Sequence, residues 1–235
     1  MEKTAKQMGS ELRKLGNTKD AQFLQGFFKT GKGQYGEGDI FLGVRVPKTR
    51  KLVKAFRGTG LDEILILLKS EFHEARLLAL LMMVDLFQRS DEKQKPVYEA
   101  YLRNTAYINN WDLVDSSAHK IVGVWLLDRP HAPLIKLASS SNLWKKRIAV
   151  LSTLHFINHG RFETTLEIAD MLLEDGHDLI HKAVGWMLRE IGNRNPAAEE
   201  EFLKPRYKRM PRTMLRYAIE KFEEPKRQDY LKGRR

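Results

Sequence analysis

The chain has 235 residues, of which 42% are hydrophobic, so it can bury a core as one large domain or as two small ones. Lys and Arg total 41 against 30 Asp and Glu, and the resulting formal net charge of +11 favours a polyanionic partner. The sequence contains no Cys, which excludes disulfides, thiolate catalysis and Cys-ligated metal sites. No apolar run approaches the roughly 18 residues needed to span a bilayer, and residues 1–6 lead into no apolar signal region. We therefore expect a cytoplasmic protein without a membrane partner.

Apolar residues recur at helical spacing along almost the whole chain, and no strand-like alternation is long enough to compete. The predicted fold class is therefore all-α. Pro47 and Pro96 stand where a first helical turn tolerates proline, whereas Pro130 and Pro133 mark a short connection between helices. In chain order the predicted helices cover residues 3–15, 18–30, 47–57, 61–70, 72–89, 91–104, 111–127, 131–138, 142–158, 162–174, 178–192, 196–203 and 211–222.

The helical pattern also repeats loosely. Similar segments begin near positions 76, 115, 147, 182 and 212, at intervals of about 30–39 residues. Two helices per unit are typical of an α-solenoid of HEAT-like repeats, whose second helices line a concave face. If that face is basic, duplex DNA is a suitable rod-like anion for it. We predict one such domain over 1–225, followed by a basic tail at 226–235 that is a solvated face or a floppy terminus. An irregular helical bundle is the alternative.

The segment GKGQYG at residues 31–36 matches the G-x-G-x-x-G pattern of dinucleotide-binding loops. Residues 23–29 before it form an amphipathic helical pattern rather than a strand, and no βαβ unit follows. The segment is therefore predicted to be a flexible loop between helices, whose backbone amides and Lys32 could contact a phosphate.

Histidines occur in two pairs at i, i+4 spacing, His155 with His159 and His177 with His181, but neither pair has a third ligand at a suitable position. His73 and Glu74 begin like a zincin motif that lacks its second histidine. The histidines of these segments are therefore predicted to be surface or core residues. We expect neither a metal nor a cofactor.

The four tryptophans have different surroundings. Trp125 lies in the apolar stretch IVGVWLL and is predicted to be core, whereas Trp144 fits either core or surface. Trp111 and Trp186 lie beside charged or small residues and fit either a core position or an exposed aromatic platform. On a helix, Trp111 and Asp115 share one face, and a carboxylate there is unusual for a protein that binds DNA. The basic segment 204–216 is predicted to be either a phosphate-contacting or a solvated face.

Three motifs occur in a specific order and spacing: WDLVDS at 111–116, LWKKR at 143–147 and KAVGWMLRE at 182–190. Together with LGVRVP at 42–47, they closely resemble the AlkD-type alkylpurine DNA glycosylases, which are DNA alkylation repair proteins built of HEAT-like repeats. The resemblance extends over nearly the whole chain.

The resemblance implies excision of cationic N3- or N7-alkylated purines from duplex DNA, without the flipping of the base into a pocket that most glycosylases need. By position, it implies that Asp115 is the catalytic acid and that Trp111 and Trp186 hold the deoxyribose. It further implies that Arg147 and Arg189 contact DNA.

The sequence departs from the family pattern at three positions. His155 stands where the family has lysine, Arg45 stands where it has glutamine, and Phe23 is an aromatic residue without the hydroxyl. These departures affect peripheral DNA contacts, for which Arg45 and His155 remain candidates. They leave the central carboxylate unaffected.

The residues and the resemblance lead to one functional hypothesis. An alkylated purine carries positive charge and can leave without protonation, so Asp115 need only stabilise the sugar cation and orient water. Lys146, Arg147 and Lys182 would anchor phosphates of double-stranded DNA. We expect a monomeric, monofunctional enzyme that is cytoplasmic and nucleoid-associated, of prokaryotic type, and that leaves an abasic site.

Two alternatives use the same fold. One is a non-catalytic HEAT-repeat protein that binds branched or distorted DNA, and the other is a helical scaffold for an acidic protein. A pure DNA binder has no need of an acid like Asp115 with its flanking aromatics. A protein scaffold gives no reason for the combination of Trp111, Asp115, Arg147 and Trp186.

Overall fold

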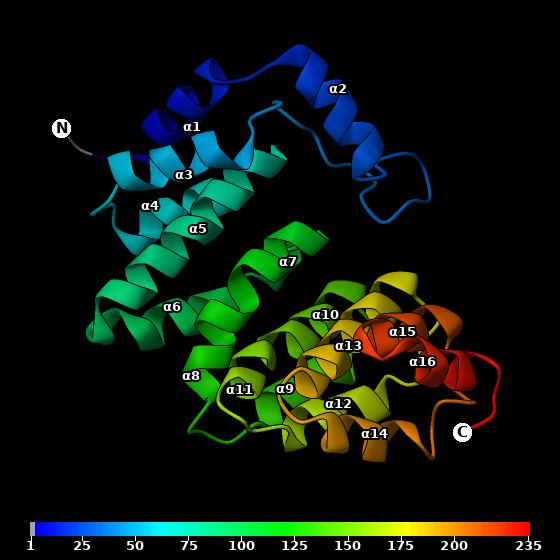
Figure 1. Cartoon of the computed structure of the whole chain (residues 1–235). Helices are drawn as coiled ribbons and strands as arrows, with labels where there is room; N and C mark the ends of the chain where they lie inside the picture. The colour runs from blue at the N-terminus through cyan, green and yellow to red at the C-terminus, as the bar shows by residue number, and fades with distance from the viewer. Residues whose placement is uncertain (1–2) are drawn as a thin grey trace. The chain divides into compact units, whose positions relative to one another are not determined.

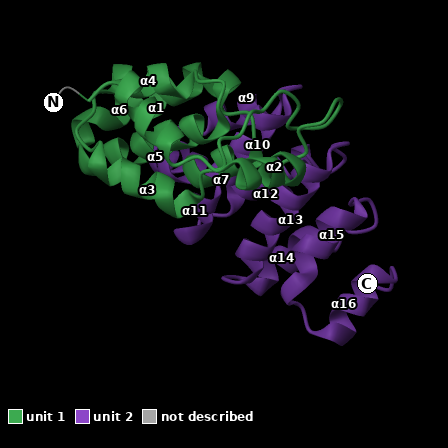
Figure 2. Ribbon diagram, turned by 90° about the horizontal axis from the view of Figure 1, so that it is seen from above, with its two compact units in different colours: residues 1–117 green, residues 118–235 purple. Residues whose placement is uncertain are grey.

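The computed structural model describes residues 3–235, which form helices joined by turns and loops (Figure 1). The all-α prediction is confirmed. The described residues contain one isolated β-bridge, between Ile40 and Phe72, and no β-strand. Backbone contacts divide the chain into two compact units, Met1–Ser117 and Ala118–Arg235, coloured separately in Figure 2. The single domain over 1–225 stays a prediction.

The first unit is built around one long helix, α5 (His73–Arg89), most of whose side chains are buried. Helices α1, α3, α4 and α6 pack against it. The helices of this unit are α1 (Ala5–Lys14), α2 (Thr18–Phe27), α3 (Val46–Ala55), α4 (Leu61–Leu68), α5, α6 (Asp91–Arg103), the 3₁₀ turn η1 (Thr105–Tyr107) and α7 (Trp111–Ala118), whose last residue belongs to the second unit.

Local sequence explains where the first helices begin. Thr4 forms a capping box with Gln7, and Asn17 accepts a hydrogen bond from the Asp20 amide at 3.0 Å. Residues 28–45 form the loop predicted around the glycine-rich segment. This loop is attached to the start of α5, because the His73 amide donates to the Ile40 carbonyl at 2.9 Å.

The second unit is centred on α13 (Asp178–Gly192), which packs against α10, α12, α14 and α15. Its elements are the π-helical turn η2 (His119–Gly123), α8 (Val124–Leu126), α9 (Ala132–Ala138), α10 (Leu143–Ser152), α11 (Leu154–Asn158), α12 (Glu163–Met171), α13, α14 (Pro196–Leu203), α15 (Arg212–Ala218), the 3₁₀ turn η3 (Ile219–Lys221) and α16 (Glu224–Leu231). Helices α10, α13 and α15 start 35 and 34 residues apart, within the predicted spacing.

Two helices predicted as continuous are interrupted. Residues 142–158 form α10 and α11, because the hydroxyls of Ser152 and Thr153 donate to the carbonyls of Ile148 and Val150 and compete with the helical pattern. Residues 111–127 include the π turn η2. At its end, Gly123 lies so close to α10 that a Cβ would stand 2.3 Å from the Ser152 carbonyl oxygen.

The basic tail predicted over 226–235 is partly helical. Residues Glu224–Leu231 form α16, and Tyr230 is 1% exposed. The Tyr230 ring packs edge-on against Tyr207 and Phe222, with centroid distances of 5.2 and 5.6 Å. Basic residues dominate the composition of this segment, but its aromatic ring is buried against two others.

Candidate functional site

Helix α7 carries Trp111 and Asp115 one turn apart, as predicted. Its first amides are held locally, because the side chain of Asn110 accepts from the Trp111 amide at 2.8 Å and that of Asp112 accepts from the Leu113 amide at 2.9 Å. Both Trp111 and Asp115 are half-buried. The start of α7 therefore presents an indole and a carboxylate along one helical face.

The Trp111 ring is held by aromatic residues at the end of α2. It stacks on Phe28 at a centroid distance of 5.1 Å and an interplanar angle of 17°, and it meets Phe27 edge-on at 6.0 Å. Trp111, Phe27 and Phe28 also line a mostly apolar cavity of about 310 Å³ within the first unit. Trp111 therefore has one ring face covered by Phe28 and also lines a cavity. This arrangement is intermediate between the core position and the exposed aromatic platform that the sequence allowed.

Asp115 lies near a buried hydroxyl pair. The Tyr101 hydroxyl, on α6, is 2.9 Å from the Ser117 hydroxyl, which in turn donates to the Leu113 carbonyl at 2.5 Å. Burial raises the pKa of Tyr101, and the negative charge of Asp115 acts in the same direction. Tyr101 therefore stays protonated, and its hydroxyl fixes the helical turn that carries the carboxylate.

A buried polar cluster lies beside α7, and the sequence analysis did not identify it. His73 Nδ1 is 3.0 Å from Asp39 Oδ2, and His73 Nε2 is 2.9 Å from Asp112 Oδ2. Arg76 pairs with Asp39, which also accepts from Asn110 Nδ2 at 2.8 Å. His73 is 1% exposed, so of the two predicted alternatives, surface or core, it is a core histidine. Its partners lie 34 and 39 positions away, and no local pattern indicates them.

The neighbouring Glu74 explains the segment LGVRVP at 42–47. Its carboxylate accepts from the amides of Leu42, Gly43 and Val44 at 2.9, 2.8 and 3.1 Å. Gly43 has φ of +79°, and a Cβ there would stand 2.0 Å from the Asn17 carbonyl oxygen. The segment is thus fixed from both sides before α3 begins.

Arg45 stands at the start of α3 and lines the same cavity as Trp111. Its guanidinium donates to Asp20 at 2.6 Å and lies 5.3 Å from the centroid of the Phe23 ring. The hydrogen bond from Arg45 lowers the pKa of Asp20. Half of the Arg45 side chain is exposed, so this candidate DNA contact is accessible although it is paired.

In the second unit, α13 carries Trp186, Lys182 and Arg189. Trp186 is half-buried and its Nε1 donates to Glu190 at 3.1 Å. Lys182 pairs with Asp178 at 2.8 Å, and Arg189 pairs with Glu220. The three residues predicted to contact DNA therefore project from one helix, and the two cations among them, Lys182 and Arg189, have acidic partners.

The two cations predicted on α10 lie close to α13. Lys146 pairs with Asp175 at 2.6 Å. Arg147 is only 5% exposed, and its Nη1 donates to the Leu179 carbonyl at 2.6 Å. Arg147 therefore joins two helices of the second unit, a structural role that the sequence did not indicate. Its contact with DNA stays a prediction.

His155 differs from the lysine that the family pattern has at this position. Burial lowers its pKa, and the neighbouring His159, with a ring-centroid distance of 4.4 Å, contributes in the same direction. His155 is therefore neutral at neutral pH. It can donate or accept a hydrogen bond, but it does not replace the cation.

The remaining tryptophans belong to the second unit. Trp144 is buried, with 8% exposure. Trp125 was predicted to be core but is partly exposed, and the Arg129 guanidinium lies 3.7 Å from its ring centroid. The apolar sequence around Trp125 therefore did not predict its burial correctly. The Arg129 guanidinium, rather than apolar core residues, covers the ring.

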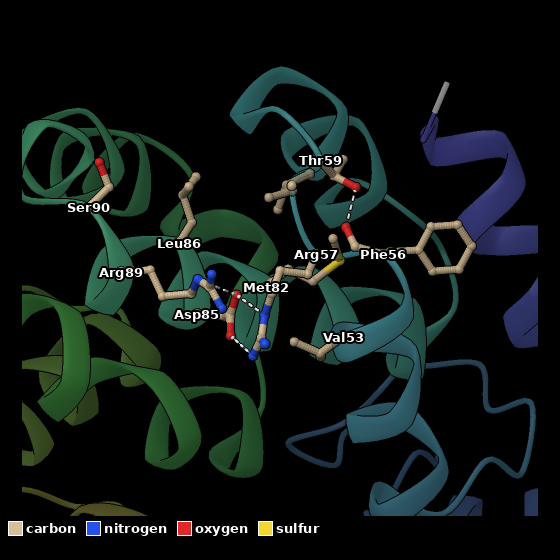
Figure 3. Close-up of a pocket in the computed structure, with 11 residues that line it drawn as sticks. Val53, Phe56, Arg57, Thr59, Met82, Asp85, Leu86, Arg89 and Ser90 are labelled. Carbon is tan, nitrogen blue, oxygen red and sulfur yellow. Dashed lines mark hydrogen bonds and ion pairs between the residues drawn. The ribbon is translucent and has the colours of Figure 1, made fainter. Parts of the chain in front are cut away.

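A second cavity of the first unit, of about 280 Å³, lies among α3, α4 and α5 (Figure 3). Arg57 donates to both oxygens of Asp85, at 2.7 and 3.3 Å, and Arg89 Nε is 3.9 Å from the same carboxylate. None of the predicted site residues lines it. The described residues contain no cluster of His, Asp and Glu suited to a metal ion and no helix long and apolar enough to cross a membrane.

Comparison with known proteins places these residues in a family. No curated protein matches the sequence. Among solved structures, a protein described as a predicted DNA alkylation repair enzyme from Enterococcus faecalis is similar, with a TM-score of 0.67 over 89% of this chain and 97% of that one. The two sequences are 19% identical, so this likeness shows the fold. The model of the family described as DNA alkylation repair enzyme matches residues 8–222, and the chain therefore belongs to that family.

Proposed function

We propose that the protein is a monofunctional DNA glycosylase that hydrolyses the N-glycosidic bond of purines alkylated at N3 or N7, such as 3-methyladenine and 7-methylguanine. The observation that carries the proposal is the pairing of Trp111 with Asp115 on α7 in a chain of the DNA alkylation repair family. The products would be the free base and an abasic site in duplex DNA.

The chemistry of the substrate determines what the enzyme must supply. A purine alkylated at N3 or N7 is positively charged, so it departs as a neutral base and needs no general acid. The deoxyribose is left as an oxocarbenium ion, and a fixed carboxylate stabilises that charge. Removal of one preorganised group of this kind costs about 2.7–4 kcal/mol in transition-state stabilisation. Asp115 takes this role and orients the attacking water.

The aromatic and basic residues have separate tasks in the proposal. Trp111 and Trp186 offer ring faces that attract a cation by about 0.5–2 kcal/mol each. Lys146, Arg147 and Lys182 contact DNA phosphates, as do the more peripheral Arg45 and Arg189. The reaction needs no nucleophilic lysine, metal or cofactor, because the leaving group is already activated and water completes the step.

The decisive experiment compares three proteins on methylated duplex DNA in the presence of a chelator: wild type, Asp115→Asn and Asp91→Asn. Asp91 is an exposed carboxylate of α6 and serves as the control. We expect wild type and Asp91→Asn to release methylated purines and to leave abasic DNA. Asp115→Asn should bind the same DNA but release bases at least about 100-fold more slowly.

Each outcome separates the hypotheses. Wild-type turnover by Asp115→Asn would remove Asp115 from the chemistry. Tight DNA binding with no release by any of the three proteins would identify a non-catalytic DNA-binding protein instead.

A further inference from the structure

The first unit contains a buried histidine with a carboxylate on each side. His73 is the first residue of α5, Asp39 belongs to the loop before α3, and Asp112 lies in the first turn of α7. The two ring nitrogens are 3.0 Å from Asp39 and 2.9 Å from Asp112. When both carboxylates are ionised, both ring nitrogens must donate, and an imidazole donates from both only when it is protonated.

The charges around the ring support the same state. Burial disfavours the cation, but the carboxylates of Asp112 and Asp39 outweigh it and raise the pKa of His73 to about 9. Asp39 is also paired with Arg76 and accepts from Asn110. The cluster therefore holds two carboxylates and two cations, and the imidazolium is the cation that faces Asp112. The adjacent Glu74 is engaged with the amides of residues 42–44.

Two sets of contacts connect His73 to α7. Asp112 uses one oxygen for the Leu113 amide at 2.9 Å and the other for His73, which fixes the first turn of the helix. The His73 ring also lies 5.0 Å from Phe28, and Phe28 stacks on Trp111. Trp111 and Asp115 thus project from a helical turn that His73 contacts through Asp112 and Phe28.

We propose that His73 is a positioning residue for the candidate site: as a cation held between Asp39 and Asp112, it fixes the start of α7 and thereby the directions of Trp111 and Asp115. The proposal rests on the proposed function for its catalytic consequence. The cation has an electrostatic effect as well, because Asp112 and Asp115 lie three residues apart on one helix and repel each other when both are charged. By neutralising Asp112, His73 leaves Asp115 as the carboxylate available to a developing sugar cation.

The test uses Asp112→Asn, which keeps the shape of the side chain and removes the charge facing His73. A second variant, His73→Gln, removes the cation. His131→Gln is the matched control, since His131 is also hydrogen-bonded, to Thr164 at 2.6 Å, and lies 4.7 Å from the Phe156 ring, but it belongs to the second unit. Single-turnover base release is measured against pH, together with affinity for the same duplex and the melting temperature.

We expect Asp112→Asn and His73→Gln to slow base release about 10- to 100-fold while DNA affinity changes little, because the loss is one of orientation. Wild-type release should fall as pH rises through about 9, and in Asp112→Asn this fall should move to lower pH. His131→Gln should match wild type. An unchanged rate and pH profile in Asp112→Asn would overturn the proposal, even if His73→Gln fails to fold.

A second readout is independent of catalysis. The indole N–H signal of Trp111, assigned by its absence in Trp111→Phe, should shift in the NMR spectrum of free His73→Gln and stay in place in His131→Gln. An absence of base release by wild type would defeat the proposed function, and this signal would still decide the positioning role. A Trp111 signal unmoved by His73→Gln would refute that role.

Discussion

Buried acids in this protein are distinguished by whether a partner compensates their charge. Asp39 has His73, Arg76 and Asn110 as partners, and its pKa is lowered although burial acts in the opposite direction. Glu199, on α14, is 2% exposed and its Oε1 accepts no hydrogen bond from the described residues. Burial raises its pKa to about 8. The same chemical group is thus ionised in one setting and protonated in the other.

Glu199 gives a stability prediction with a definite sign. Its pKa is about 8 in the folded chain against 4.5 without the fold, so the native state binds the extra proton in that interval and stability falls as pH rises through it. Glu199→Gln keeps the volume and removes the ionisation. We expect the variant to melt several degrees above wild type at pH 8, at about 2–4 °C per kcal/mol, and by a smaller margin near pH 5.

The control for this prediction is Glu201→Gln, an exposed residue of the same helix. Charges near Glu199 include Lys226, Glu200 and Arg189, and the attraction of Lys226 reduces the expected gain. Thermal melts followed by circular dichroism at the two pH values measure the effect. A difference between Glu199→Gln and wild type that does not change with pH would show that Glu199 is already ionised in the fold.

At the scale of single elements, glycine determines how closely α13 approaches α15. A Cβ on Gly185 would stand 2.5 Å from the Met214 carbonyl oxygen and 2.6 Å from Tyr217 Cβ. Gly185 directly precedes Trp186, so the helix contact and the candidate indole belong to the same turn. The sequence KAVGWMLRE therefore contains a packing requirement as well as candidate DNA contacts.

We expect Gly185→Ala to reduce the free energy of unfolding by about 1–3 kcal/mol, because the added methyl group must separate two packed helices. Gly176→Ala is the control, since nothing lies within 4 Å of the Cβ that it would introduce. Urea denaturation measures both changes. Equal unfolding free energies for Gly185→Ala and wild type would mean that α15 moves away at no cost.

Most of the helices could be predicted from the sequence, because the local spacing of apolar residues determines them. The range 178–192 was predicted to the residue, since His177 caps the first turn and Gly192 ends the apolar pattern. The helix Glu224–Leu231 was not predicted, because the burial of Tyr230 depends on Tyr207, which lies 23 positions earlier. Local patterns contain no information about contacts at that separation.

At the scale of the whole molecule, the net charge of +11 does not tell which cations are available to bind phosphates. The sequence identified Arg45, Lys146, Lys182 and Arg189 as candidates, but it could not reveal that each has a carboxylate within pairing distance. Most of those carboxylates lie 25 to 31 positions away in the chain, as Asp20, Asp175 and Glu220 do. Phosphate binding must therefore compete with these pairs.

This competition can be measured through the salt dependence of binding to undamaged duplex DNA. Each phosphate contact contributes about 0.9 to the slope of log affinity against log salt concentration. Lys182→Ala should therefore lower the magnitude of the slope by about that amount if Lys182 exchanges Asp178 for a phosphate.

Lys95→Ala is the matched control, because Lys95 also pairs with an acid one turn away, Glu99 at 3.9 Å, and carries no predicted contact. Fluorescence anisotropy at several salt concentrations gives both slopes. A reduced slope for Lys182→Ala alone would assign a phosphate to that residue. Wild-type slopes for both variants would mean that Lys182 keeps its partner Asp178 when DNA is bound, and the positive field of the molecule would then act through other cations.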